Sequence, residues 1–597
     1  MTANVHKGAV DPVTLSVVWS RLLSIARETT ERVMYSAQSW VMANAKDVGA
    51  VLLNPEGQIL TQVEVLPCHS LLAEVPTKVM LDKFGKLDPG DFVLGNDGHI
   101  VKSGHLPDWT FLSPMYWHDE LLGYVHMRGH MADSGGAYTG GYWPRGYDCI
   151  AEGINIPPVK IIEKGKVNEE LYGLILRNVR NSPVVRADNM VIHGSMERAG
   201  EAVCELVDKY GLDTVRACFD EVMRAGEEAM RKEIRQFREG VYTGEAAVDW
   251  DGTTPDRLVW IRVKLTIKGD EMVFDFSDSM DQVDFVNSPL GNTYAYTYLG
   301  LFLSMDSTIP HNHGALVPIT IIAPEGKVVN PTYPHTYGAC ALACGIHIYE
   351  ACLQALGKAN PEKTPAPWSR PFTPNPMGRL PMIDPRTGVE VEYFAAPFIE
   401  GGGGGAIKGY DGWPGYLSAG GVGSLIRGSV ENIEMFVPFR WNCVELRQDS
   451  EGPGEFRGCA GLYCERECLA PEGARTWIMS GSSDGQETPI AGQAGAPPAP
   501  LPSMYFKRVG KEEREHFRCM DLTEVNPGDV LITYNTGGAG WGDPLDRDVE
   551  KVRKDVKEGI VSIERARDIY GVLIDGESLE VDYKATEQLR KKGKAKK

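Results

Sequence analysis

One stretch constrains the fold more than any other: SGHLPDWTFLSPMYWHDELLGYVHMRGHMADSGG. It carries the pattern His-x-x-Asp twice, first as His105 with Asp108 and then as His130 with Asp133. Two runs of β-forming residues, TFLSPMYW and LLGYVHMRG, separate the copies and flank the turn sequence His-Asp-Glu. The stretch therefore predicts a β-hairpin whose turn centres on Asp119.

A hairpin centred on Asp119 would bring the two copies to the same end. Asp108 would face His130 and His105 would face Asp133, because both pairs are symmetrical about the turn. Opposed residues of an antiparallel pair have Cβ atoms roughly 5 Å apart, so their side chains are within reach of a shared ion.

A mixed set of imidazoles and carboxylates suits manganese, iron or zinc better than calcium. Either copy alone could instead be a pair of turn residues, with the aspartate accepting hydrogen bonds from backbone amides. Two copies that meet at one hairpin end favour the metal. The residues therefore predict a divalent-metal site.

Composition excludes several classes of protein. The net charge of −20 argues against non-specific binding of nucleic acid and against an anionic membrane surface. The N-terminal residues have no apolar signal-like run, and no uncharged apolar run is as long as a membrane span. The 12 cysteines never form C-x-x-C. We expect a reduced, cytoplasmic protein.

The chain of 597 residues is too long for one hydrophobic core. Helical periodicity dominates early and late in the chain, and β-type runs dominate between them. We predict an α+β fold of several units, with an N-terminal metal-bearing α/β part and a β-rich C-terminal part. The expected units are an N-terminal metal-site domain (1–239), a central α+β domain (240–357), a proline-rich connection (358–386), a β-rich domain (387–545), and C-terminal helices with a basic tail (546–597).

Two other features have simple structural explanations. Cys340, Cys344 and His347 recur at helical spacing within an apolar run, which indicates a buried helix face more than a metal site. The glycine run 401–405 could present backbone amides to an anion, but a flexible loop or lid is the more common outcome. The sequence contains no phosphate loop and no dinucleotide-binding motif.

Several motifs together resemble the hydantoinase B family. They are GNDGHIVKSGHLPD, GHMADSGG, GINIPPVKI, DFSDSMDQVDFVNSPLGNTYAYTYL, IPHNHGALVPITIIAPEGKVVNP, LRQDSEGPGEFRGCAGL and GGAGWGDPLDRDVEKVRKDVKEGIVSIERARDIYGV. They extend over nearly the whole chain. The family includes subunits of acetone and acetophenone carboxylases, N-methylhydantoinases and 5-oxoprolinases.

The resemblance implies a set of metal ligands. In the acetone carboxylase branch the matching subunit holds manganese, and its ligands fall on Asp47, His105, Asp108 and His130. The carboxylase has a glutamate at the position of Asp47, so the aspartate is a shorter variant. The resemblance thus favours Mn²⁺, with Zn²⁺ or Fe²⁺ as alternatives.

Three further residues receive supporting roles by resemblance. Asp133 matches an acidic residue beside the site. It would hold one of the metal ligands in its orientation without binding the metal itself. His69, in LPCHSLLAE, matches a histidine typical of the family, and either it or Glu64 could transfer a proton. A packed histidine at a helix start is an equally simple explanation of His69.

Two departures from the hydantoinase pattern favour a carboxylase. This chain reads His130-Met131-Ala132-Asp133 where hydantoinases commonly read His-His-Ala-Asp, and it lacks their Asp-Pro-Tyr sequence at Asn96-Asp97-Gly98. The resemblance then implies the catalytic C–C bond-forming subunit of an ATP-dependent ketone carboxylase, which joins an activated ketone enolate to carbon dioxide derived from bicarbonate.

Two alternatives stay open. The first is a subunit of an ATP-dependent cyclic amide hydrolase of the N-methylhydantoinase or 5-oxoprolinase type. The second is a metal-free structural subunit. For both the carboxylase and the cyclic amide hydrolase, ATP would bind to a separate hydantoinase A-type ATPase subunit within a hetero-oligomer.

Overall fold

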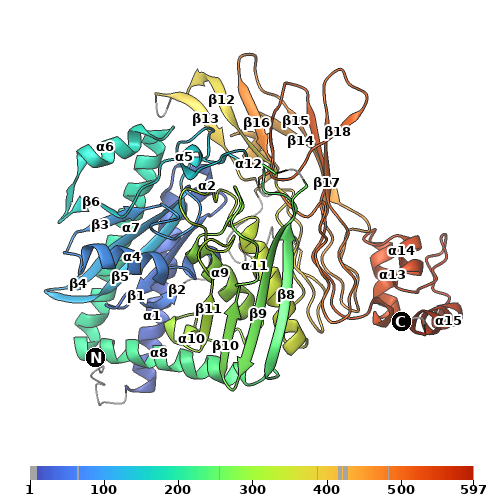
Figure 1. The fold of residues 1–597 in the computed structure, drawn as a ribbon, viewed down its shortest axis with the longest axis horizontal. Helices are drawn as coiled ribbons and strands as arrows, with labels where there is room; N and C mark the ends of the chain where they lie inside the picture. The colour runs from blue at the N-terminus through green and yellow to red at the C-terminus, as the bar shows by residue number, and fades with distance from the viewer. Residues whose placement is uncertain are drawn as a thin grey trace.

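The computed structural model describes residues 10–62, 66–254, 256–385, 388–397, 399–414, 420, 428–481 and 483–595. Four β-sheets and a set of helices build the molecule, and the N-terminal and C-terminal parts lie at opposite ends (Figure 1). The predicted α+β class is confirmed. Within the described residues, no helix combines the length and the apolar character that crossing a bilayer requires.

The N-terminal part is built on a seven-stranded antiparallel sheet of order β2-β1-β5-β4-β3-β6-β7. Its strands are β1 (Val48–Leu53), β2 (Ile59–Gln62), β3 (Phe92–Gly95), β4 (Asp108–Trp117), β5 (Glu120–His130), β6 (Val159–Glu163) and β7 (Lys166–Val167). All six residues of β1 are buried because both faces of the sheet are covered.

Long helices cover one face of this sheet and short helices cover the other. Asp11 begins the first long helix by accepting a hydrogen bond from Thr14 N, with Pro12 at its first position. The long helices are α1 (Pro12–Ser36), α7 (Ser182–Tyr210) and α8 (Leu212–Ile234), and the shorter ones of this part are α2 (Trp40–Ala43), α3 (Pro67–Ser70), α4 (Glu74–Phe84), α5 (Cys149–Glu152) and α6 (Glu169–Arg177).

A second sheet, of order β11-β10-β9-β8, forms the centre of the molecule. It consists of β8 (Gly240–Val248), β9 (Val259–Lys268), β10 (Glu271–Asp275) and β11 (Ile319–Ile322), and it packs against α9 (Leu290–Phe302), α10 (His313–Leu316) and α11 (Cys344–Ala359). Cys344 and His347 are buried on α11, as predicted for a helix face in the core, whereas Cys340 is buried in the turn before this helix. His347 Nε2 lies 2.8 Å from Asp484 Oδ2.

The β-rich part contains two more sheets, of orders β13-β12-β16-β19 and β14-β15-β20-β17-β18. The first of these sheets contains β12 (Asn375–Ile383), β13 (Glu390–Phe394), β16 (Arg475–Met479) and β19 (Leu522–Glu524). The second contains β14 (Phe439–Leu446), β15 (Leu462–Cys468), β17 (Ser503–Lys507), β18 (Arg514–His516) and β20 (Val530–Tyr534). Helix α12 (Val430–Glu434) precedes β14. Strand β12 lies inside the proline-rich range 358–386. The proposed domain boundaries stay predictions.

The glycine run 401–405 is packed inside the β-rich part. A Cβ atom on Gly405 would lie 2.0 Å from Ala366 O, and one on Gly403 would lie 2.5 Å from Cys459 Sγ. Gly404 N also donates a hydrogen bond of 2.7 Å to Trp413 O. The expectation of a flexible lid is therefore wrong, because glycine here permits close backbone packing.

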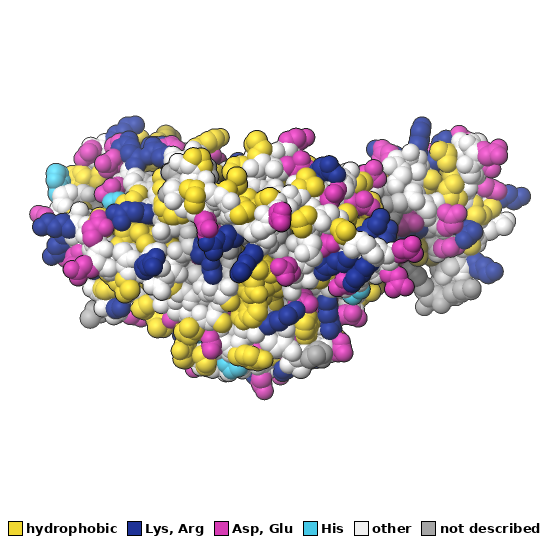
Figure 2. Space-filling model, turned by 90° about the horizontal axis from the view of Figure 1, so that it is seen from above, with side chains coloured by type: hydrophobic (Ala, Val, Ile, Leu, Met, Phe, Trp, Pro, Cys, Tyr) yellow, Lys and Arg dark blue, Asp and Glu magenta, His cyan; other side chains and the backbone are white. Residues whose placement is uncertain are grey.

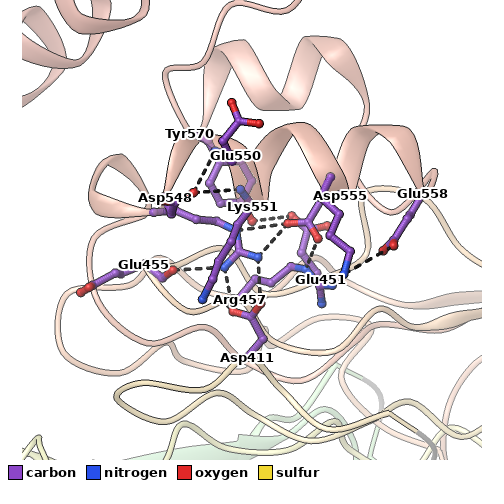
Figure 3. A network of polar contacts seen from close by, with 12 residues as sticks. Asp411, Glu451, Glu455, Arg457, Asp548, Glu550, Lys551, Asp555, Glu558 and Tyr570 are labelled. Atoms are coloured by element: carbon purple, nitrogen blue, oxygen red, sulfur yellow. Dashed lines mark hydrogen bonds and ion pairs between the residues drawn. The ribbon is translucent and has the colours of Figure 1, made fainter. Parts of the chain in front are cut away.

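The C-terminal helices α13 (Val549–Lys557), α14 (Ile563–Asp568) and α15 (Tyr583–Lys594) form a unit with its own small core. This unit protrudes at one end of the molecule (Figure 2). Arg547, whose side chain is 1% exposed, binds both oxygens of Asp411 at 2.7 and 2.9 Å and contacts Asp555 at 2.8 Å. Arg457 reaches Asp555 from the β-rich side at 3.0 Å (Figure 3).

Replacing Arg547 with alanine should loosen the C-terminal unit. The carboxylates of Asp411 and Asp555 would lose the guanidinium that they share, at a cost of about 3 kcal/mol. Calorimetry of Arg547→Ala should show an earlier unfolding transition than the natural chain. Lys554→Ala, which removes a surface lysine 3.7 Å from Glu558, is the control and should leave the transition unchanged. Equal behaviour of both variants would contradict this role of Arg547.

Candidate functional site

The candidate site lies at the end of the N-terminal sheet where β4 begins and β5 ends. The predicted hairpin is confirmed, and Asp108 is the register partner of His130. The turn at the far end joins Trp117 to Glu120, after an irregularity between Met115 and Tyr116. Asp108 and His130 therefore meet at the open end of the hairpin, whereas the strand pairing ends there and does not extend to His105 and Asp133.

Asp47 reaches the same place because β1 is the other neighbour of β5. Val48 is the register partner of Gly129, and the His130 amide donates a hydrogen bond of 3.0 Å to Asp47 O. Sheet pairing thus places the start of β1, the end of β5 and the start of β4 side by side. His69 comes from α3, and His105 precedes β4 in the turn where Asp108 N donates to His105 O.

Backbone carbonyls orient the rings of three histidines. The Nδ1 atoms of His69, His105 and His130 lie 3.3, 3.1 and 3.0 Å from the carbonyl oxygens of Arg128, Gly338 and Met131, respectively. A ring nitrogen that faces a carbonyl carries the proton, so each ring presents a lone pair on Nε2. This is the tautomer that a metal ligand needs.

The three rings and two carboxylates form two overlapping groups that could hold a metal ion. One group is His105, Asp108 and His130, and the other is Asp47, His69 and Asp108; within each, the candidate ligand atoms lie within 4.8 Å of one another. His105 Nε2 is 2.9 Å from Asp108 Oδ2. His69 Nε2 is 3.3 Å from both Asp108 Oδ2 and Asp47 Oδ1.

A lone pair on Nε2 and a carboxylate oxygen repel each other unless a cation lies between them. The buried Oδ1 atom of Asp108 has no hydrogen-bond partner among the described residues. Asp47 Oδ1 accepts no hydrogen bond either, although His69 is close. Buried carboxylate oxygens are rarely left in this state. The donor set therefore fits a divalent cation.

Arg128 keeps Asp108 ionised. Burial raises the pKa of Asp108, but the guanidinium of Arg128, with Nη2 2.6 Å from Oδ2, lowers it. The pKa of Asp108 is therefore held well below its usual range. Gly104 makes room for this arginine, since a Cβ atom at that position would lie 2.1 Å from Arg128 Nη2.

Burial shifts the other groups toward their neutral forms. It raises the pKa of Asp47 well above its usual value, and the nearby charge of Asp108 raises it further. It lowers the pKa of His130 to about 3 and also lowers that of His69. Neutral imidazoles are the form that binds a metal.

Aromatic rings close one side of the site. The ring of Phe394, from β13, stacks on His130 with a centroid distance of 5.8 Å and an interplanar angle of 6°. Tyr142 places its hydroxyl 3.2 Å from His130 Nε2. A cavity of about 40 Å³ borders the cluster and is lined further by Tyr296 and Asn375.

Asp133 does not contact the cluster in the way its resemblance implied. Its carboxylate accepts hydrogen bonds from the amides of Gly135, Gly140 and Arg180 at 2.8, 3.0 and 2.7 Å, and from Arg180 Nη1 at 3.2 Å. These contacts organise the loop after β5. A role in orienting a ligand stays a prediction. Glu64 lies outside the described residues.

Sequence reasoning missed two buried groups that support the histidines. Arg128 lies two residues before His130 on one strand, so the alternation of β5 could have indicated that both point to the same face. Glu152 accepts hydrogen bonds from Tyr337 N and Gly338 N at 3.0 and 2.7 Å, beside the carbonyl that holds His105. No local sequence signal announces this contact.

Known proteins share this architecture. The caprolactamase beta subunit of Pseudomonas jessenii is 32% identical over 95% of this chain and 97% of its own. The crystal structure of the ATP-dependent caprolactamase from that organism matches with a TM-score of 0.88 and 30% identity, over 98% of this chain and 100% of that chain.

Two further relatives align over most of the chain. A putative D-/L-hydantoinase B subunit of Pseudomonas sp. (strain NS671) is 27% identical over 98% of both chains. The acetophenone carboxylase delta subunit of Aromatoleum aromaticum is 22% identical over 97% of this chain and 89% of its own. The model of the hydantoinase B/oxoprolinase family matches residues 11–544. The chain belongs to the hydantoinase B/oxoprolinase family.

Proposed function

We propose that Asp47, His105, Asp108 and His130 bind a divalent metal ion, with Mn²⁺ favoured and Zn²⁺ and Fe²⁺ as alternatives. The convergence of the three strand ends, the Nε2 atoms directed into the cluster and the Asp108 oxygen without a partner among the described residues support this proposal. When bound, such an ion supplies Lewis acidity toward a carbonyl oxygen or a water molecule. His69, beside Asp47 and Asp108, is the proposed proton carrier.

The proposed reaction is the ATP-dependent opening of a cyclic amide. The end-to-end likeness to the caprolactamase beta subunit carries this proposal, at 32% identity against 22% for the acetophenone carboxylase delta subunit. It reverses the preference that the sequence alone suggested. The cluster of histidines and carboxylates beside a small cavity could serve such a ring opening.

The residues of this chain can move the required protons. Adding water across the amide bond joins oxygen to the carbonyl carbon, breaks the C–N bond and delivers a proton to nitrogen. His69 Nε2 carries a lone pair, so it can take the proton from water and return it to the leaving nitrogen. Phe394 and Tyr142 limit access of other water to the cluster.

ATP would act on a partner subunit. This sequence has no phosphate loop, and the relatives are named as subunits of larger enzymes. We infer that a hydantoinase A-type ATPase transfers the terminal phosphoryl group of ATP to the carbonyl oxygen of the substrate within a hetero-oligomer. On this chain, water would then add to the activated carbon, the C–N bond would break, and a second water would release inorganic phosphate.

A ketone carboxylase is the second candidate. Two observations on the sequence favour it. The motif His130-Met131-Ala132-Asp133 has a single histidine where hydantoinases commonly have two, and their Asp-Pro-Tyr sequence is missing at Asn96-Asp97-Gly98. That reaction would consume bicarbonate and a ketone and would need no water at the reacting carbon.

The two candidates differ in what they consume. We expect the complex of this chain with its ATPase partner to open a cyclic amide such as a lactam or a hydantoin only when ATP is present, as measured by chromatography of the amino acid product. Labelled bicarbonate with acetone or acetophenone is the parallel assay. Incorporation of the label without ring opening would establish the carboxylase instead.

Metal content should follow the proposed ligands. His105→Ala and Asp108→Asn should each lower the bound metal at least tenfold, measured by elemental analysis after dialysis. His516→Ala, which removes an exposed histidine on β18, is the control and should keep the metal of the natural chain. Equal metal content in all four proteins would place the ion elsewhere or exclude it.

Arg128 should affect metal affinity without being a ligand. Arg128→Met removes the cation that keeps Asp108 ionised, so the pKa of Asp108 should rise and metal affinity should fall by about ten- to a hundredfold near pH 7. Affinity should recover partly as the pH increases, because a higher pH deprotonates Asp108 again. A titration of the apo protein with Zn²⁺ at several pH values would measure both effects, and a pH-independent affinity would contradict them.

A further inference from the structure

One polar side chain in the cavity has no role in the cluster of histidines and carboxylates. Asn375, the first residue of β12, is 1% exposed and lines the same cavity as His105 and Asp108. It comes from the β-rich part of the chain, whereas the cluster comes from the N-terminal sheet (Figure 1). A substrate between the two parts would contact both.

The carboxamide of Asn375 is unpartnered. Neither Nδ2 nor Oδ1 has a hydrogen-bond partner among the described residues, although both atoms are buried. The two tyrosine hydroxyls of the cavity, by contrast, have partners: that of Tyr296 donates to Ala341 O at 2.6 Å, and that of Tyr142 lies 3.2 Å from His130 Nε2. A buried donor and acceptor left open together indicate a ligand that supplies both partners.

The backbone holds Asn375 in a fixed place. Pro374 and Pro376 flank it and restrict the chain to an extended conformation. Its register partner in β16 is Met479. The carbonyl of Pro374 accepts a hydrogen bond from the buried guanidinium of Arg466. A recognition group held this rigidly loses little entropy when it binds.

We propose that Asn375 selects the substrate by pairing with the N–H and C=O groups of a cyclic amide, an inference that rests on the proposed function. A ring forces these two groups onto the same side, so they form a donor and an acceptor side by side. The asparagine carboxamide presents the complementary pair, as it does toward the edge of adenine. Asn375 is a specificity-determining residue and takes no part in bond breaking.

Other small molecules match this carboxamide less well. A ketone offers an acceptor for Nδ2 but leaves Oδ1 without a donor. A carboxylate or bicarbonate also offers acceptors alone, and Nδ2 could pair with it but Oδ1 could not. A cyclic amide with a free N–H satisfies both atoms.

The test compares a lactam with its N-methyl analogue. In the natural complex with the ATPase partner, kcat/KM should be higher for the lactam with the N–H group. Asn375→Leu should lower kcat/KM for that lactam about ten- to a hundredfold and lower it much less for the N-methyl analogue. The ratio of the two substrates should therefore fall. Because the ATPase partner is the same in both complexes, a change in this ratio of kcat/KM values measures the effect of Asn375 alone.

Stability separates recognition from a structural role. An unpartnered carboxamide contributes nothing to folding, so Asn375→Leu should keep or raise the Tm of the chain. Asn375→Ala serves as a second variant with the same expectation for the substrate ratio. Asn442→Leu, at an exposed position of β14, is the control and should keep the ratio of the natural complex.

The outcomes distinguish the two proposals. If the natural complex opens lactams but Asn375→Leu and Asn375→Ala keep the natural ratio, Asn375 does not select the substrate, and the proposed function stands. Loss of folding in both variants would likewise overturn the inference, because it would give Asn375 a structural role. A natural complex that opens no cyclic amide would overturn the proposed function and this inference with it.

Discussion

Asp108 Oδ2 is the point on which the site depends. Arg128, His105 and His69 all approach this one atom, at 2.6, 2.9 and 3.3 Å. Arg128, which is itself buried, keeps the carboxylate charged, and the proposed metal ion would separate that charge from the Nε2 lone pairs. The antiparallel register that pairs Asp108 with His130 adds the third histidine, and the pairing of β1 with β5 adds Asp47. Sheet geometry and one ion pair thus assemble residues from four separate segments.

The parts of this site that follow from local sequence were predictable. The hairpin and the meeting of Asp108 with His130 require only strand alternation and a turn, and they are confirmed. The α+β class follows from the change in hydrophobic period along the chain. Asp47 and His69 required a family resemblance, because no sequence spacing connects them with the hairpin.

The errors and omissions have a physical cause. The glycine run 401–405 suggested freedom of the backbone, whereas close packing against Ala366 and Cys459 excludes any Cβ atom there. Asn375 was overlooked because the flanking prolines suggested a mere connection, although the strand they begin faces the cavity. Contacts between the N-terminal and β-rich parts join residues far apart in sequence, and local patterns cannot reveal them. The proposed specificity depends on that junction, with the proposed metal ligands on one side and the proposed amide-recognising side chain on the other.

The most direct test of the account is a crystal structure of the chain with its ATPase partner, recorded at the absorption edges of manganese, iron and zinc. The account predicts an anomalous difference peak within coordination distance, roughly 2.0 to 2.2 Å, of Asp47, His105, Asp108 and His130. Absence of a peak in a complex that is active in the same preparation, or a peak bound by other residues, would contradict it.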